Sequence, residues 1–179
     1  QGKRLAEAKG EILMGASYIE FYAEEAKRVY GDIVRDPRLG KRIVIIKQLV
    51  GVVGAITRWN FLNSMITRKC AAALGVGCTK VVKLASQTQY SALAVAVLAK
   101  EAGFLDGVFN VIIGLASEIG KELTSNFIVR KISFIGFTEV GKILLEQSVS
   151  IVKKVSMEFG GHASFIVFDD ADMDEVVVG

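Results

Sequence analysis

The pattern of apolar and polar residues changes near residue 40. From Lys3 to Tyr30, apolar side chains recur among Glu and Lys with no strong breaker, which predicts a long helix. The stretch RDPRLGKR, Arg35 to Arg42, gathers proline, glycine and charge and predicts a boundary. After it, KRIVIIKQLVG (41–51) is rich in β-branched residues and predicts a strand. The first forty residues are therefore expected to form a helical segment that leads into a separate unit.

From residue 52 onward, strand-like and helix-like patterns alternate. Strands are expected over 52–57, 79–85, 108–114, 131–136, 153–159 and 164–168, and helices over 64–77, 91–103, 117–124 and 138–149, with Gly103 as a helix cap. The strands are nearly continuous runs of Val and Ile, which is typical of strands buried on both faces. The sequence therefore predicts an α/β fold with a parallel sheet and helices on both faces. Ligands of such sheets bind at the carboxyl ends of the strands.

Composition narrows the class of protein. The chain has 179 residues, of which 51% are hydrophobic and 23% charged, so one globular domain, with at most a small appendage, is expected. No uncharged apolar run reaches the roughly 20 residues of a membrane span, and the N-terminus lacks the apolar core of a signal peptide. The net charge of +3 is scattered, which argues against nucleic acid. Cys70 and Cys78 lack metal-site spacing and suit a reduced intracellular compartment.

Four expected strand ends carry unusual residues. They read TRWNF (57–61), KLAS (83–86), GFTEVG (136–141) and MEFGG (157–161). GFTEVG opens a helix, whose free backbone N–H groups and positive dipole end suit a pyrophosphate. Glu158 is a single carboxylate between Met157 and Phe159, which are expected to shield it from water. Taken singly, each stretch also has a structural explanation, such as a packed Trp59 or a solvated Lys83.

In this order and at these separations, TxWNF, KxAS, FxGxTxxG and ExGG resemble the aldehyde dehydrogenase superfamily. The intervening stretches QGKxLAEAKGEI, MITRK, SNxxVRKISF and FIVFDDADMD are similar to those of succinate-semialdehyde dehydrogenases in particular. The resemblance covers the whole chain. It implies an oligomerisation strand over 41–51, a Rossmann-like NAD(P)-binding domain over 52–160, and the start of a catalytic domain over 161–179.

The resemblance also implies roles for individual residues. Asn60 would donate its amide to the oxyanion of the thiohemiacetal, and Glu158 would be the general base that activates the hydrolytic water. Lys83 would bind the ribose hydroxyls of the cofactor. Ser86 stands where many relatives place a glutamate, and a small neutral residue leaves room for a 2′-phosphate, so either NAD or NADP is expected. The remaining cofactor contacts implied are Trp59, Asn60, Gly136, Phe137, Thr138, Gly141 and Phe159.

The implied substrate is a small aldehyde with a carboxylate, most simply succinate semialdehyde, which would be oxidised to succinate. Arg68 in MITRK would hold that carboxylate through its planar fork, although a surface arginine is the alternative. His162, the only histidine, is interpreted as structural, and no metal site is expected. Relatives of this kind form homo-oligomers and work in the cytoplasm or the mitochondrial matrix.

The chain also departs from the family pattern. It ends at Gly179, before the segment that carries the family's catalytic cysteine, and neither Cys70 nor Cys78 lies in a matching motif. Pro37 is its only proline, where average usage predicts roughly nine. Phe137 stands where the family's phosphate loop has a serine, and Ile135 where it has a threonine. These changes suggest mutational decay, so the alternative function is that of a non-catalytic relative that serves as a binding or oligomerising module.

Overall fold

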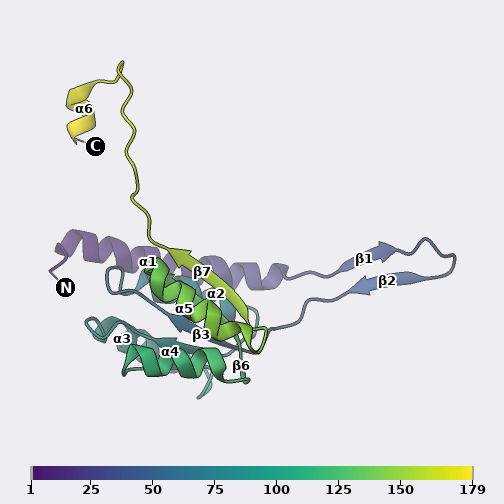
Figure 1. Cartoon of the computed structure of the whole chain (residues 1–179). Coiled ribbons are helices and arrows are strands. Elements are labelled where there is room, and N and C mark those ends of the chain that lie inside the picture. Colours follow the sequence, from purple (N-terminus) through teal and green to yellow (C-terminus); the bar gives the residue numbers. More distant parts are fainter. Residues whose placement is uncertain (1, 179) are drawn as a thin grey trace.

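A five-stranded parallel sheet organises the chain. The computed structural model describes residues 2–178. The strand order is β5-β4-β3-β6-β7, with β3 (Val52–Ile56), β4 (Lys80–Lys83), β5 (Phe109–Ile112), β6 (Val129–Gly136) and β7 (Lys154–Phe159). The connecting helices are α2 (Ser64–Leu74), α3 (Tyr90–Glu101), α4 (Ala116–Ser125) and α5 (Thr138–Val149). The alternation predicted from residue 52 to residue 159 is confirmed (Figure 1).

Helices cover both faces of the sheet, as predicted. Ala55 and Val82 belong to one buried cluster with Ile66 of α2. Ile132 belongs to a second cluster with Leu123 of α4, and Val81 packs against it. Consecutive residues such as Val81 and Val82 therefore face opposite cores, which explains why the strands read as continuous apolar runs. The predicted α/β fold class is confirmed.

The N-terminal helix packs on α2. This helix, α1 (Leu5–Glu25), is followed by a short 3-10 turn, η1 (Ala26–Arg28), so it ends earlier than the predicted Tyr30. Its close approach to α2 depends on Gly15, where an added Cβ would lie 1.9 Å from the Asn63 side-chain oxygen. The wall that α1 and α2 build together lies beside the strand end that carries TRWNF (57–61), because Lys3, just before α1, donates to the Asn60 carbonyl.

A two-stranded hairpin follows the helix. Strands β1 (Asp32–Arg35) and β2 (Arg42–Ile45) pair antiparallel, with Ile33 opposite Val44. The first forty residues are therefore not wholly helical, because the β-branched Ile33 and Val34 form a strand. The boundary predicted at 35–42 is the turn of this hairpin, and the predicted strand is confirmed only over Arg42–Ile45. The hairpin projects away from the sheet (Figure 1).

The strand predicted over 164–168 is wrong. This segment runs away from the sheet without a strand partner among residues 2–178 and leads to α6 (Met173–Val178) (Figure 1). Phe165 and Ile166 are exposed along it. An apolar run alone does not make a strand, which also requires a neighbour that supplies ladder hydrogen bonds.

Candidate functional site

The strand order changes direction between β3 and β6. The chain passes from β3 through α2 to β4 on one side, and from β6 through α5 to β7 on the other. The carboxyl ends of β3 and β6 therefore flank a topological switch point, which is the usual position of a ligand in an open α/β sheet. Arg58 follows β3 and Phe137 follows β6, and the guanidinium carbon lies 5.2 Å from the centre of the ring. Residues from both sides of the switch point are thus in contact.

The predicted phosphate loop begins α5. Gly136 is the last residue of β6, Phe137 is the exposed residue that precedes the helix, and Thr138 is the first helical residue. The first N–H groups of a helix have no partner inside it, and together with the dipole they attract anions. Gly141 lies against Phe159 of β7, since a Cβ on this glycine would lie 2.1 Å from the ring. The structure therefore gathers five of the predicted cofactor residues around the start of α5.

Lys83 and Ser86 lie at the end of the neighbouring strand. Lys83 is the last residue of β4 and is only 3% exposed, and its amine donates a hydrogen bond to the Leu84 carbonyl. Burial lowers the pKa of Lys83. Ser86 occupies an exposed turn, and its carbonyl accepts a hydrogen bond of 2.9 Å from the Gln89 amide. Contact of these two residues with a ribose remains a prediction.

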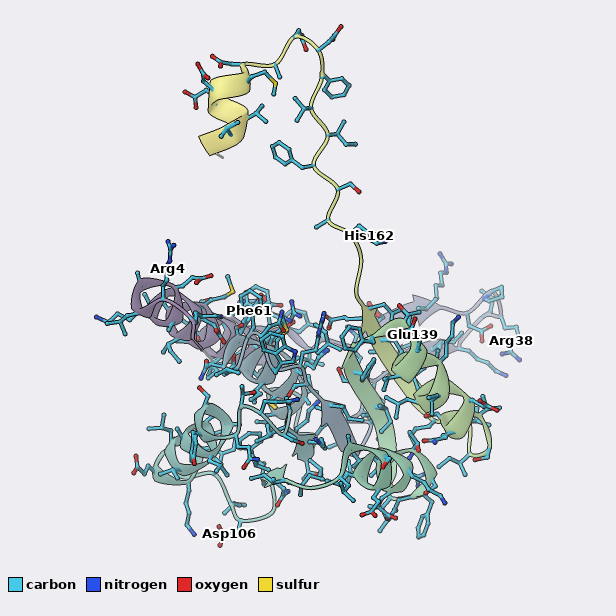
Figure 2. All side chains as sticks on the ribbon, turned by 60° about the vertical axis from the view of Figure 1, so that its left-hand side comes forward. Arg4, Arg38, Phe61, Asp106, Glu139 and His162 are labelled. Carbon is cyan, nitrogen blue, oxygen red and sulfur yellow. The ribbon has the colours of Figure 1, made fainter. Side chains whose placement is uncertain are left out.

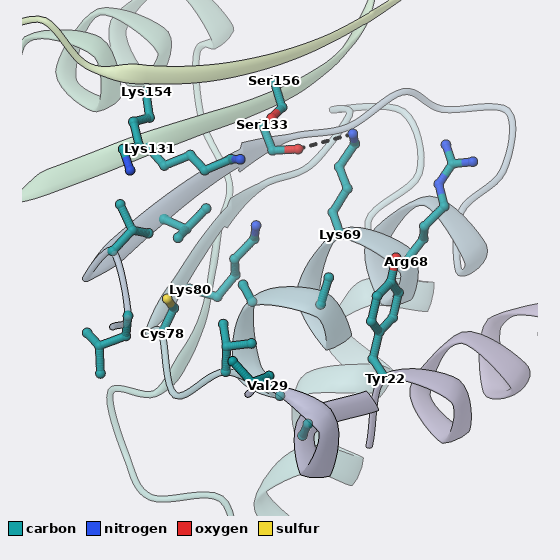
Figure 3. Close-up of a pocket in the computed structure, with 18 of the residues that line it drawn as sticks. Tyr22, Val29, Arg68, Lys69, Cys78, Lys80, Lys131, Ser133, Lys154 and Ser156 are labelled. Atoms are coloured by element: carbon teal, nitrogen blue, oxygen red, sulfur yellow. Dashed lines mark hydrogen bonds between the residues drawn. The ribbon is translucent and has the colours of Figure 1, made fainter. Parts of the chain in front are cut away.

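Glu158 is held by two consecutive cations of α2. Its Oε2 accepts a hydrogen bond of 2.7 Å from Arg68 Nη2, and its Oε1 accepts one of 2.6 Å from Lys69 Nζ. Lys69 also donates to Ser133 Oγ at 3.2 Å (Figure 3). The sequence pointed to Arg68 and Glu158 but missed Lys69. The available signal was the pair of adjacent cations in MITRK, of which only one was expected to be functional.

Glu158 is not shielded by its apolar neighbours, contrary to the sequence-based expectation. Its side chain is 45% exposed. Met157 packs in the core on the opposite face of the sheet, and Phe159 leans on Gly141 of α5. Adjacent residues of a strand point to opposite faces, so neither neighbour covers the carboxylate. The environment of Glu158 is instead set by the cations of α2.

The loop that carries Asn60 is anchored to α1. Lys3 Nζ donates to the Asn60 carbonyl at 2.9 Å and forms an ion pair with the buried Glu11. Glu11 Oε1 in turn accepts a hydrogen bond of 2.8 Å from the Asn63 N–H and one of 3.4 Å from the Ser64 N–H. A carboxylate at this position satisfies free amides at the start of α2 and complements its dipole. Neither Lys3 nor Glu11 was predicted from the sequence.

The aromatic residues of this loop differ in their surroundings. The Lys3 amine lies 4.2 Å from the centre of the Phe61 ring, beside α1 (Figure 2). Trp59, which was predicted to contact the cofactor, has about half of its surface exposed at the end of β3. The structure therefore places Trp59 and Asn60 at the same edge of the sheet as Glu158 and Gly136.

The remaining reactive residues take no part in this arrangement. Cys70 and Cys78 are both buried, and burial raises the pKa of the Cys70 thiol to about 12, so this thiol is protonated and unreactive near neutral pH. His162 is exposed on the segment that leaves the sheet (Figure 2). Within residues 2–178 there is no group of three side chains able to hold a metal ion. Over the same range, no helix is both long and apolar enough to cross a membrane.

A cavity of about 920 Å³ lies on the α2 side of the sheet. Glu158, Arg68 and Lys69 line one part of it. Tyr22 of α1 and residues 47–50 also line it. Figure 3 shows the Lys131 and Ser133 side chains of β6 and the Lys154 and Ser156 side chains of β7 at this cavity. The cavity thus connects the clamped carboxylate with a wider space over the sheet.

Known proteins share this fold and sequence. The chain is 59% identical over 179 residues to the succinate-semialdehyde dehydrogenase [NADP(+)] of Escherichia coli (strain K12). The aligned region covers 100% of this chain and 37% of that relative. It is 58% identical to a glutarate-semialdehyde dehydrogenase of Pseudomonas aeruginosa, with the same coverage. The crystal structure of succinate-semialdehyde dehydrogenase from Burkholderia pseudomallei superposes with a TM-score of 0.97 at 56% identity, over 99% of this chain and 37% of that one.

The chain thus spans a little over a third of the length of the curated relatives that it matches. The sequence model of the aldehyde dehydrogenase family matches residues 1–179. This match agrees with the parallel sheet and with the order of the four strand-end motifs. The chain belongs to the aldehyde dehydrogenase family.

Proposed function

We propose that the chain provides the cofactor-binding part and the general base of an NAD(P)-dependent dehydrogenase that oxidises an aldehyde with a distal carboxylate. The observation that carries this proposal is Glu158, placed at the carboxyl end of β7 and clamped by Arg68 and Lys69. The relatives from Escherichia coli and Pseudomonas aeruginosa are named for succinate semialdehyde and glutarate semialdehyde. Both are aldehydes that carry a carboxylate, and succinate semialdehyde is the substrate that we favour.

Glu158 is suited to activate water. Its two oxygens accept hydrogen bonds from cationic donors, so the carboxylate is fixed in one orientation and remains partly open to solvent. A base fixed in this way can accept a proton from a water molecule that attacks an acyl group. The chain's two cysteines are buried, so neither is proposed as the nucleophile that forms the acyl group.

Asn60 is proposed to stabilise the oxyanion. An amide donor is effective when it is held in place before charge develops, because no reorganisation is then needed. The Lys3 hydrogen bond to the Asn60 carbonyl and the Glu11 contacts at the start of α2 provide such anchoring.

The strand ends around the switch point fit a dinucleotide. Gly136, Phe137, Thr138 and Gly141 surround the start of α5, and Arg58 adds a cation beside Phe137. Lys83, Ser86, Trp59 and Phe159 would complete the contacts, and the neutral Ser86 suits NADP as well as NAD. When bound, the nicotinamide supplies the hydride acceptor of the oxidation.

Arg68 can serve both the base and the substrate. Its Nη2 donates to Glu158 and lies 3.1 Å from Met65 Sδ, whereas within residues 2–178 its other N–H groups make no hydrogen bond. A guanidinium offers five donors in one plane. We propose that the remaining donors hold the substrate carboxylate, so that Arg68 aligns the substrate with Glu158.

The hairpin is proposed to join copies of the protein. Ile33 and Val44 are exposed on it, as is Ile46 just after β2. A two-stranded ribbon with apolar faces and free edges is a template for pairing. A Val44→Lys substitution should shift the sedimentation coefficient of the assembled protein towards that of the monomer. An unchanged sedimentation coefficient would rule out this surface.

A chimera tests the catalytic proposal. Residues 1–179 would replace the matching segment of the Escherichia coli relative, and NADP⁺ reduction by succinate semialdehyde would be followed in a spectrophotometer. Glu158→Gln should lower kcat by about 10²–10⁴-fold, because a general base contributes on that order. Glu146→Gln, on the surface of α5, is the matched control and should leave kcat unchanged. Equal activity of both variants would contradict the role of Glu158.

A further inference from the structure

Three lysines lie in one row across the sheet. In the strand register, Lys80 of β4 is aligned with Val53 of β3, and Val53 is aligned with Lys131 of β6. Lys131 is in turn aligned with Lys154 of β7. Aligned residues of neighbouring parallel strands lie about 4.8 Å apart and point to the same face. All of them line the 920 Å³ cavity, and Figure 3 shows the Lys80 and Lys131 side chains entering the same space.

This row lies apart from the candidate catalytic residues. Lys154 and Glu158 are four residues apart on β7, which corresponds to about 13 Å along a strand. The catalytic carboxylate is therefore at one end of the cavity and the lysine row at the other. The lining of the cavity also includes the apolar residues Val29, Leu49 and Val76.

The cavity is strongly cationic. Lys47, Arg68 and Lys69 line it in addition to the three lysines of the row. Among the described residues that line it, Glu158 is the one acidic residue, and this carboxylate is already paired with Arg68 and Lys69. Within residues 2–178, the amines of Lys80, Lys131 and Lys154 form no hydrogen bond or ion pair. The positive charge of the row is therefore uncompensated in the part of the chain that the structure describes.

Lys80 is the clearest sign that a counter-ion belongs there. The residue is only 1% exposed, although its amine reaches the cavity. The ammonium therefore meets solvent only through the cavity, and an ammonium that is largely desolvated and has no partner is costly, so such groups are normally paired. Lys69 of α2 and Lys131 of β6 add to this cost because they repel the Lys80 charge, whereas the neighbouring Cys70 and Cys78 act in the opposite direction.

We propose that the lysine row and the cavity above it form a second anion-binding site for a small molecule with two or more oxyanion groups. Three ammonium groups in a row match a ligand whose negative charges are spread over several atoms, such as a di- or tricarboxylate or a diphosphate. Ser133 and Ser156 lie two residues beyond Lys131 and Lys154 on β6 and β7. They line the same cavity, and their hydroxyls can donate to such a ligand. The three lysines of the row are not among the residues proposed above for the cofactor and the aldehyde, although they share the cavity with Glu158.

Calorimetric titration of the purified 179-residue chain with citrate and with inorganic pyrophosphate tests this site. We expect saturable binding of one ligand per chain, weakened about tenfold or more in Lys80→Met and in Lys154→Met, because each loses a charged donor. Lys154 is exposed, so its substitution should not disturb folding. Tighter binding of citrate than pyrophosphate would identify a polycarboxylate site, and the reverse order a phosphate site. Absence of saturable binding with both probes would overturn the proposal.

Lys83→Met is the matched control. Lys83 is as deeply buried on β4 as Lys80, but its amine is already bonded to the Leu84 carbonyl. This variant should weaken NADP⁺ binding and leave citrate affinity unchanged. Lys80→Met should instead weaken citrate binding and leave NADP⁺ affinity unchanged. An equal loss of citrate affinity in both variants would show that the row is not the site. These two variants thereby distinguish a failure of the proposed anion site from a failure of the proposed NADP⁺ site.

The pH dependence of citrate binding gives a second readout. Burial, followed by repulsion from Lys69 and Lys131, lowers the pKa of Lys80 to about 8. A bound anion favours the charged amine, so citrate affinity should fall as the pH rises from about 7 to about 9. In Lys80→Met this fall should be reduced. A wild-type affinity that is the same at both pH values would contradict the role of Lys80.

Discussion

The two faces of β6 and β7 differ in what covers them. On one face, Ile132, Val155 and Met157 pack in the apolar cluster with Leu123 of α4. On the other face, Lys131, Ser133 and Ser156 line the cavity. The two sets alternate along the same strands, so each strand separates a closed core from an open, charged space.

This difference points to function. In β3, the residues facing both sides are apolar or glycine, as expected for a strand buried on both faces. Polar residues at alternate positions of β6, which lies between β3 and β7, serve no packing purpose, since polar groups are costly to bury. The face of β6 and β7 that carries them is therefore the face where a ligand or further protein is expected, and the closed face is where stability should reside.

The largest expected effect lies on the closed face. Ile132 is 0% exposed, and Ile132→Ala should lower the free energy of unfolding by about 2–5 kcal/mol, because it leaves a cavity in the core. Ser133→Ala, one residue away on the open face, removes a hydrogen bond to Lys69 and should cost only about 1 kcal/mol. Urea unfolding of both variants checks the contrast. Similar losses would show that the two faces contribute equally to stability.

The second effect lies on the open face and depends on pH. The pKa of Lys80 is about 8 in the folded chain and 10.5 ordinarily, so between these values the unfolded state binds more protons. Stability should therefore rise with pH from about 8 and level off above the ordinary value, by about 3 kcal/mol in all. Lys80→Met should remove this rise and stabilise the chain at neutral pH. Denaturant titrations across this range, with Lys142→Met on α5 as the control, measure both effects.

The third effect concerns the wall of the open face. Glu11 accepts N–H groups at the start of α2 and pairs with Lys3, so Glu11→Gln should cost about 2 kcal/mol by weakening a buried charged network. Glu7→Gln, at an exposed position of the same helix, is the control. Thermal unfolding followed by circular dichroism compares the two variants. Equal melting temperatures would show that α1 does not anchor the Asn60 loop through Glu11.

Much of the fold was predictable from the sequence because it depends on local patterns. Continuous Val and Ile runs separated by helical repeats specify a parallel sheet with helices on both faces. Gly103 was recognised as a helix cap, and it has the positive φ of 88° that favours glycine there. The strand predicted over 164–168 failed because strand formation depends on a partner that a local pattern does not reveal.

The site was predictable to the extent that its residues follow strands. Asn60, Lys83, Gly136 and Glu158 were placed at strand ends, and the structure brings these ends to one edge of the sheet. The contacts of Lys69 with Glu158 and of Lys3 with Asn60 join residues far apart in the sequence, so no local pattern indicates them. The lysine row likewise follows from register, which is a property of strand pairing.

Calorimetric titration of the purified chain with NADP⁺ tests most directly whether the strand ends at the switch point form a dinucleotide site. We predict saturable binding of one NADP⁺ per chain, weakened by Lys83→Met and strengthened by Phe137→Ser, which removes an exposed ring from the start of α5. The absence of saturable binding to a chain that is folded by circular dichroism would contradict the account.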